Sequence, residues 1–311
     1  MGIREHFHFK DTAKIYILTW QFILLRFALM LVFIGIAVFY FSSILGVVLS
    51  QIGVDSIFKV ILSVGSISTA TYLYYHIYKL FSRYIFYIVK SAHIALITDY
   101  IQNGRTPKLN QLFQGFRLMK DRFLSISLLF VVDRVLEAVL KEVHQRIMKF
   151  GADLKLPKAL TYIISGTIHT ATNYVDEAIL AYMFTRKNES AWKSAKDGLI
   201  LYVKNWMWIL ATAAILSAIV YGTMAFFGVY VYFEGIPFNS AGVILQSIYG
   251  VMTVGIVILA YSGIVQPFME ISIIVTYLKE IKGQTPDSKT FQWVKNNSKN
   301  FSRLLMPKLP V

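Results

Sequence analysis

Residues 27–54 read FALMLVFIGIAVFYFSSILGVVLSQIGV, a stretch in which no side chain carries a charge. About 20 apolar residues in a helix cross the hydrocarbon core of a bilayer, where only a helix satisfies its own backbone polar groups. The uncharged stretches at 206–233 and 236–269 pass this length, and residues 60–78 just reach it with His76 inside. The sequence therefore predicts an all-α fold, a polytopic transmembrane helical bundle.

The composition favours lipid over water as the solvent of this chain. Of its 311 residues, 56% are hydrophobic and 15% aromatic, and the mean hydropathy is +0.56, which is more apolar surface than a soluble domain of this length buries. The net charge of +14 comes from basic residues between the apolar stretches, where they face anionic headgroups. We therefore expect membrane lipids with anionic headgroups as partners, a homo-oligomer or another membrane protein as a further candidate, and no nucleic acid.

The segment between the apolar stretches, residues 122–187, carries more charge. Residues 123–132 are apolar but are followed by charged side chains, and residues 159–175 are uncharged apart from His169. We interpret both as spans with a polar face. This interpretation predicts one membrane domain of six spans, as three helical hairpins at about 15–103, 122–187 and 206–282. The alternative is an amphipathic hairpin that lies at the membrane interface, which leaves four spans.

The basic residues predict the orientation in the membrane. Four segments hold 4, 8, 5 and 7 of the 31 lysines and arginines: residues 1–26, 79–122, 186–204 and 279–311. The connections at 43–58 and 234–242 hold none. Because Lys and Arg accumulate in cytoplasmic loops, we predict an integral, multi-pass protein with both the N- and C-termini cytoplasmic. Four spans and six spans give the same result.

A short motif recurs in the predicted cytoplasmic segments. GRTP at 104–107 is repeated as GQTP at 283–286, and Thr-Pro favours a helix start because the hydroxyl caps free amides and proline is preset for the first turn. An Asp or Asn follows fifteen residues after each cap residue, in the pairs Thr106 and Asp121, Ser190 and Asn205, and Thr285 and Asn300. We therefore predict amphipathic surface helices at about 107–121, 191–205 and 286–300. The alternative is chance similarity, because such caps are common.

The middle segment also supplies the candidate site, since ionisable residues at membrane depth are costly and are therefore candidates for function. Polar residues three or four apart form one stripe on each helix: Asp133, Glu137 and Lys141 on the first, and His169, Asn173 and Asp176 on the second, with Arg134 and Glu177 next to them as further pathway residues. On antiparallel helices the rise per residue places Arg134 opposite Asp176, Glu137 opposite Asn173, and Lys141 opposite His169. The stripes predict a substrate or ion pathway; the alternative is a structural ion pair of Arg134 with Asp176 or Glu177.

Signals for other chemistry are weak. Gln266-Pro267-Phe268 with Glu270 indicates either a kink that opens a polar pocket or a proline kink alone. The chain has no cysteine, and it contains no Walker loop, metalloprotease or serine-hydrolase motif, and no dinucleotide-binding glycine pattern. We therefore expect no enzyme, no catalytic residue, no cofactor and no metal. An enzymatic alternative would rest on Glu137 with His169.

Two stretches carry a resemblance to a known family. SAKDGLILYVKN at 194–205 is similar to a segment in the C-terminal half of the choline transporter-like family, and YVDEAI at 174–179 resembles it loosely. The resemblance covers about a tenth of the chain and implies a choline-like cation as substrate. Together these observations favour a transporter-like or lipid-handling protein for a small organic cation or lipid headgroup compound. The alternative is a non-transporting scaffold that binds anionic lipid through basic surface helices.

Overall fold

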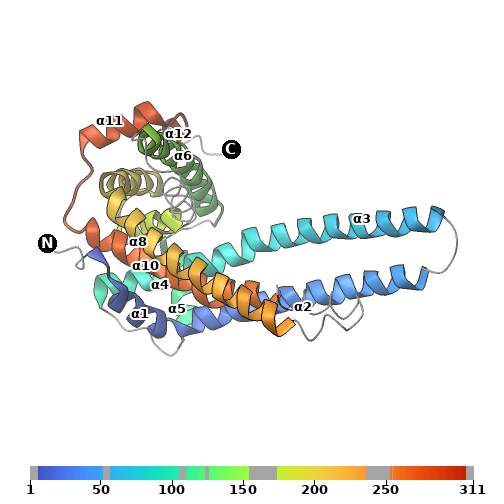
Figure 1. Cartoon of the computed structure of the whole chain (residues 1–311). Coiled ribbons are helices and arrows are strands. Elements are labelled where there is room, and N and C mark those ends of the chain that lie inside the picture. Colours follow the sequence, from blue (N-terminus) through green and yellow to red (C-terminus); the bar gives the residue numbers. More distant parts are fainter. Residues whose placement is uncertain are drawn as a thin grey trace.

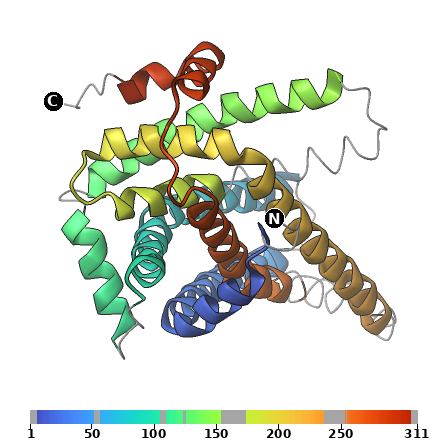
Figure 2. The ribbon, with the colours of Figure 1, turned by 90° about the vertical axis from the view of Figure 1, so that its left-hand side faces the viewer.

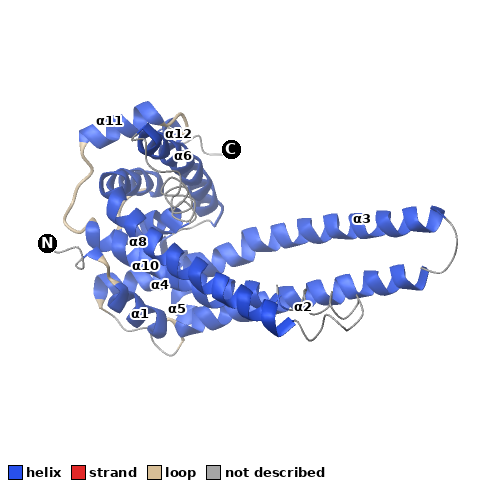
Figure 3. Ribbon diagram, viewed as in Figure 1, coloured by secondary structure: helices blue, strands red, loops and turns tan. Residues whose placement is uncertain are grey.

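The computed structural model describes residues 6–51, 57–104, 110–122, 126–153, 174–235, 253 and 255–305. All the regular secondary structure in these ranges is helical (Figure 3). The all-α prediction is therefore confirmed for the part of the chain that is described. The predicted span at 159–175 lies almost entirely outside it, as do His169 and Asn173.

The helices follow one another as α1 (Phe9–Leu18), α2 (Trp20–Gln51), α3 (Ile57–Phe81), α4 (Tyr87–Asn103), α5 (Gln111–Arg122), α6 (Ile126–Asp153), α8 (Ala191–Gly235), α10 (Gln266–Glu280), α11 (Ser288–Asn297) and α12 (Phe301–Leu305). Residues 174–185 are also helical. Two short π-helical segments, η2 (Ser82–Phe86) and η4 (Tyr261–Val265), lead directly into α4 and α10.

Four helical stretches among the described residues are long and apolar enough to cross a bilayer: Trp20–Phe41, Val64–Asn103, Ala191–Tyr230 and Gly255–Glu280. They overlap the four uncharged stretches of the sequence. Large apolar side chains such as Phe39 and Phe226 are exposed along them, as expected for surfaces that face lipid rather than water. These features indicate a multi-pass membrane protein with four candidate spans.

The helices form one long hairpin and a compact helical body. In Figure 1, α2 and α3 run side by side away from the body. The other labelled helices lie together in this body, at one end of the hairpin. Figure 2 looks onto that end and shows α2 strongly foreshortened, whereas α6 and the first half of α8 lie across the view. A layer of crosswise helices therefore covers one end of the long hairpin.

The crosswise helix α6 packs on α8 and on the C-terminal helices. His144 of α6 and the Tyr202 hydroxyl of α8 form a buried hydrogen bond of 2.5 Å. The Glu142 carboxylate accepts hydrogen bonds from the Asn300 backbone N–H at 3.1 Å and from its side-chain amide at 2.8 Å. Ser298 donates to the same carboxylate. The middle of α6 is thus fastened to the segment between α11 and α12.

The N-terminal residues contact the C-terminal end of α10. The His6 Nδ1 atom lies 2.7 Å from the Glu280 carboxylate, and the His6 ring stacks on Trp208 with 3.7 Å between centroids. Asp11 of α1 pairs with Lys279 of α10. The start of the described chain therefore packs against the end of the last candidate span.

The predicted surface helices have counterparts in α5, the first half of α8, and α11. Ser190 caps α8, since its hydroxyl oxygen accepts from the Lys193 backbone N–H at 3.2 Å. Asn205 leaves the helical conformation inside α8, with φ −112° and ψ 15°, at the predicted boundary between surface helix and span. The predicted cap of the last helix is wrong: Asp287, not Thr285, caps α11 by accepting from the Thr290 N–H at 2.8 Å.

The two glycine motifs match one another beyond the sequence similarity. Gly104 and Gly283 have positive φ angles of 62° and 76°, a left-handed conformation that is open to glycine because it lacks a Cβ atom. The π segments η2 and η4 end at Phe86 and Val265, each 18 residues before its glycine. The repeated unit therefore includes a π segment, a helix and a left-handed glycine turn.

Candidate functional site

A cavity of about 410 Å³ lies between α2, α4, α6, α10 and residues 174–185. Its wall contains five acidic side chains, Asp133, Glu137, Asp176, Glu177 and Glu270, and three basic ones, Arg26, Lys90 and Arg134. Four aromatic side chains also line it: Tyr78, Phe86, Tyr87 and Phe130. Acidic groups and aromatic faces together are the features that recognise organic cations in proteins.

Both π-helical segments border the cavity, since Phe86 belongs to η2 and Ser262 to η4. A π turn takes one more residue per hydrogen bond than an α turn, and such turns are frequent at functional sites. Gly263 in η4 allows α2 to approach closely, because an added Cβ atom would lie 2.7 Å from a ring carbon of Phe27. The π segment η4 therefore brings one candidate span into close contact with α2.

Arg26 and Glu270 form a buried ion pair on one wall. The Arg26 Nη1 atom donates to Glu270 Oε2 at 2.5 Å, and the two side chains are 7% and 2% exposed. Gln266 donates to the other oxygen of Glu270 at 3.2 Å. The second guanidinium nitrogen of Arg26, Nη2, is buried and has no hydrogen-bond partner among the described residues.

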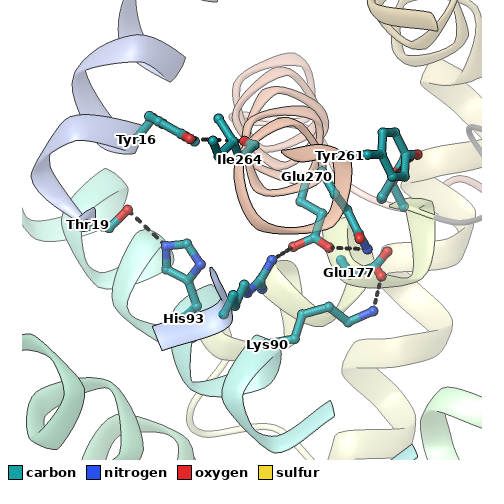
Figure 4. Close-up of polar contacts among 11 residues, drawn as sticks. Tyr16, Thr19, Lys90, His93, Glu177, Tyr261, Ile264 and Glu270 are labelled. Carbon is teal, nitrogen blue, oxygen red and sulfur yellow. Dashed lines mark hydrogen bonds and ion pairs between the residues drawn. The ribbon is translucent and has the colours of Figure 1, made fainter. Parts of the chain in front are cut away.

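Lys90 and Glu177 form a second ion pair beside the first, with Glu177 only 2% exposed. Figure 4 shows Glu270 from α10 and Glu177 from the helix at 174–185 near one another, with Lys90 reaching Glu177 from α4. Asp176 immediately precedes Glu177, and its carboxylate accepts a hydrogen bond from the Glu177 backbone N–H at 3.1 Å. One lysine therefore pairs with Glu177 and acts electrostatically on the adjacent Asp176.

Three carboxyl groups of the cavity that lie outside the four candidate spans, those of Asp133, Asp176 and Glu177, have raised pKa values. Burial raises the pKa of Asp133 to about 7, opposed by the positive charge of Lys90. Burial also raises the pKa of Asp176 to about 6. The pKa of Glu177 lies well above its usual range because of burial and then of the neighbouring Asp176 charge. A proton or a cationic ligand between these groups therefore relieves their repulsion.

The aromatic side chains lie beside this acidic cluster. The Tyr87 and Phe130 rings pack edge to face with 5.8 Å between centroids. The Arg134 guanidinium lies over the Phe130 ring, 5.0 Å from its centroid. One face of the Phe130 ring is thus already used by a cation of the protein.

Five of the eight pathway residues predicted from the sequence line this cavity: Asp133, Arg134, Glu137, Asp176 and Glu177. Lys141 is exposed and does not line it. His169 and Asn173 lie outside the described residues, so the predicted pairs Lys141 with His169 and Glu137 with Asn173 stay predictions, as does the catalytic alternative of Glu137 with His169.

The predicted pair of Arg134 and Asp176 is wrong. Arg134 Nη1 instead donates to Glu137 Oε2 at 2.7 Å, on the next turn of α6, because residues three apart on a helix are neighbours. The partner of the 174–185 helix is Lys90, which comes from α4. The facing-helix geometry assumed from the sequence left out this third helix.

Arg26 and Lys90 were not predicted as site residues, because in the sequence they stand out only as basic residues at the membrane boundary. A partial signal was present for Arg26, which is a single charge between the mostly apolar residues 15–25 and the apolar run 27–54. The signal is weakened because Thr19, Trp20 and Gln21 interrupt the first of these runs. Glu270 and Gln266 were predicted to form a polar pocket beside Pro267, and the structure places both at the cavity.

No protein-family model, curated protein or solved structure matches this chain. Among the described residues no three His, Cys, Asp or Glu side chains are grouped as a metal site. The proposed function therefore rests on the geometry of the cavity.

Proposed function

We propose that this chain is a four-span membrane protein that binds a small organic cation or a lipid headgroup in the cavity and moves or presents it at the membrane. The observation that carries the proposal is the lining of the cavity, where five carboxyl groups outnumber three basic groups beside aromatic rings. This balance favours a ligand with a positive charge.

Contacts of α6 favour four spans over six. If α6 crossed the bilayer from Ile126, Glu142 would lie about 24 Å deeper, close to the far surface of a core about 30 Å thick. Glu142 instead bonds to Asn300, which is joined to the end of α10 by a polar segment that cannot cross hydrocarbon. Arg122, just before α6, bonds to the Glu189 carbonyl and the Ser194 hydroxyl beside α8. Arg122, before the start of α6, and Glu142, in its middle, therefore belong on the same side of the membrane.

The charge distribution supports a cytoplasmic position for this side. The contacts of His6 and Asp11 with the end of α10 place the start of the described chain beside the end of the last candidate span, which is consistent with an even number of spans. The same side carries the basic segments counted above, and these segments stay in the cytoplasm. The cavity would then open near the cytoplasmic ends of the spans, at the level of lipid headgroups.

The family resemblance points to the same substrate class. The stretch 194–205 forms the first half of α8, which packs on α6, and the stretch 174–179 contains Asp176 and Glu177 at the cavity. We therefore propose a choline-like cation or choline-containing headgroup as the first ligand to test.

The test is flux in reconstituted liposomes. Asp176→Asn removes a carboxylate from the cavity at almost constant volume, so uptake of radiolabelled choline should fall at least about tenfold relative to the parent protein, the worth of one charged hydrogen bond. Lys141→Gln is the matched control, because Lys141 is exposed on the same layer and does not line the cavity. Flux equal to that of empty liposomes across candidate cations would remove transport from the proposal.

A second candidate is a lipid-binding scaffold, favoured by the exposed face of α5. Phe113 and the side chain of Arg117 are 66% and 73% exposed there, and such a basic and apolar face binds anionic membrane surfaces. For a scaffold, Asp176→Asn should alter folding or localisation alone. Charge removal at Arg117 and Lys120 should then weaken binding to phosphatidylserine vesicles.

A further inference from the structure

The cavity has an unsatisfied donor on one wall. Arg26 Nη1 is taken by Glu270, whereas the buried Nη2 has no partner among the residues that the structure describes. A buried donor without an acceptor is costly, and those in native proteins call for an explanation such as a bound ligand. The guanidinium group is suited to carboxylate and phosphate oxygens.

The adjoining wall, around Glu177, has the opposite need. Glu177 is 2% exposed and pairs with Lys90 through Oε1, while its Oε2 is buried without a donor in the described part of the chain. Asp176 and Asp133 act on the same group with further negative charge. This wall accepts a positive group, and the rings of Tyr87 and Phe130 lie beside it.

Neither a simple cation nor a simple anion satisfies both walls. A cation alone leaves Arg26 Nη2 without an acceptor. An anion alone satisfies Arg26 but enters a cavity in which acidic side chains exceed basic ones by two. A molecule that carries both charges satisfies the two walls at once. The cavity volume of about 410 Å³ is within the range of small-molecule sites.

We propose that the cavity is specific for a zwitterion. Its anionic group accepts a hydrogen bond from Arg26, and its ammonium or quaternary ammonium group lies against Asp133, Asp176 and Glu177. The inference rests on the proposed function and deepens it by naming the ligand class. Free betaines and zwitterionic lipid headgroups share this chemistry.

The test compares glycine betaine, choline and acetate as ligands of the purified full-length chain in maltoside micelles, by isothermal titration calorimetry at equal ionic strength. Betaine should bind about tenfold to hundredfold more tightly than choline, because a hydrogen bond between charged groups contributes that much, and acetate should not bind measurably. Choline binding as tightly as betaine would overturn the zwitterion inference and leave the proposed cation site intact. Binding of neither would overturn both.

Two variants test the role assigned to Arg26. Arg26→Gln with Glu270→Gln replaces the ion pair by a neutral pair, and Arg26→Lys keeps the charge but removes Nη2. In each variant the ratio of betaine to choline affinity should fall toward one, and an unchanged ratio in either folded variant would contradict the assignment. If neither variant folds, the comparison of betaine with choline on the parent protein still decides.

The source of the zwitterion is decided in nanodiscs. If the ligand is a lipid headgroup, phosphatidylcholine discs should weaken betaine binding at least tenfold relative to phosphatidylglycerol discs. Equal affinities in the two discs identify a free zwitterion as the ligand.

Discussion

The Arg26–Glu270 ion pair offers the sharpest test of the packing around the cavity. Arg26→Met removes the guanidinium but keeps an apolar side chain of similar length. At the observed 2.5 Å, the gross attraction at an effective dielectric constant of about 20 is about 7 kcal/mol. Desolvation of the two ions offsets most of this attraction, but the substitution leaves Glu270 buried without its partner.

Breaking a buried pair from one side typically costs about 3–5 kcal/mol. We therefore expect Arg26→Met to lower the free energy of unfolding by about that amount, measured by circular dichroism of the detergent-solubilised protein during titration with sodium dodecyl sulfate. The double variant Arg26→Met with Glu270→Met should recover much of the loss, because it leaves no unpaired charge.

Arg117 provides a matched control, because it pairs with Asp121 across 3.9 Å while the two side chains are 73% and 65% exposed. Water screens such a pair, so Arg117→Met should cost no more than about 0.5 kcal/mol. If Arg26→Met and Arg117→Met lower stability equally, or if the double variant is as unstable as the single one, the Arg26–Glu270 pair is not buried as described.

Three further predictions concern protonation, packing and topology. Burial raises the pKa of Asp133 to about 7 and that of Asp176 to about 6, so both carboxyl groups are ionised at pH 8 and mostly neutral at pH 5. The affinity for choline, measured by calorimetry, should therefore fall at least about tenfold from pH 8 to pH 5. An affinity that does not change with pH would contradict the role of these two groups. Gly115→Ala should lower the unfolding free energy by about 1–3 kcal/mol, since its Cβ would meet a Phe22 ring carbon at 2.5 Å, whereas Gly65→Ala meets nothing within 4 Å and should be nearly neutral. On this cysteine-free chain, single cysteines should react with an impermeant thiol reagent from outside at residues 48 and 238 but not at 152, and labelling at all three would support six spans.

Much of the local structure was predictable from the sequence. The four uncharged stretches correspond to the candidate spans, because bilayer crossing sets a length and an apolar composition that hydropathy reads directly. Ser190 caps a helix and Asn205 ends its regular conformation as predicted. The π segments η2 and η4 were not predicted, since neighbouring sequence alone carries no known signal for them.

The composition of the cavity was predictable only in part. The polar spacing in α6 and in residues 174–185 identified five lining residues, because charges on otherwise apolar helices are uncommon. Their partners were not identified. Arg134 pairs within its own helix, and Lys90 arrives from a helix that the facing-hairpin interpretation did not include.

The sequence by itself determined that this chain is helical, which of its segments are long and apolar enough to cross a membrane, and where several helices begin and turn. These properties depend on composition and on contacts a few residues apart. Only the tertiary structure decided which charges meet. Arg26 and Glu270 are 244 positions apart, and a buried charge requires a partner without specifying which one. The choice follows from how the helices pack, and that packing makes the cavity.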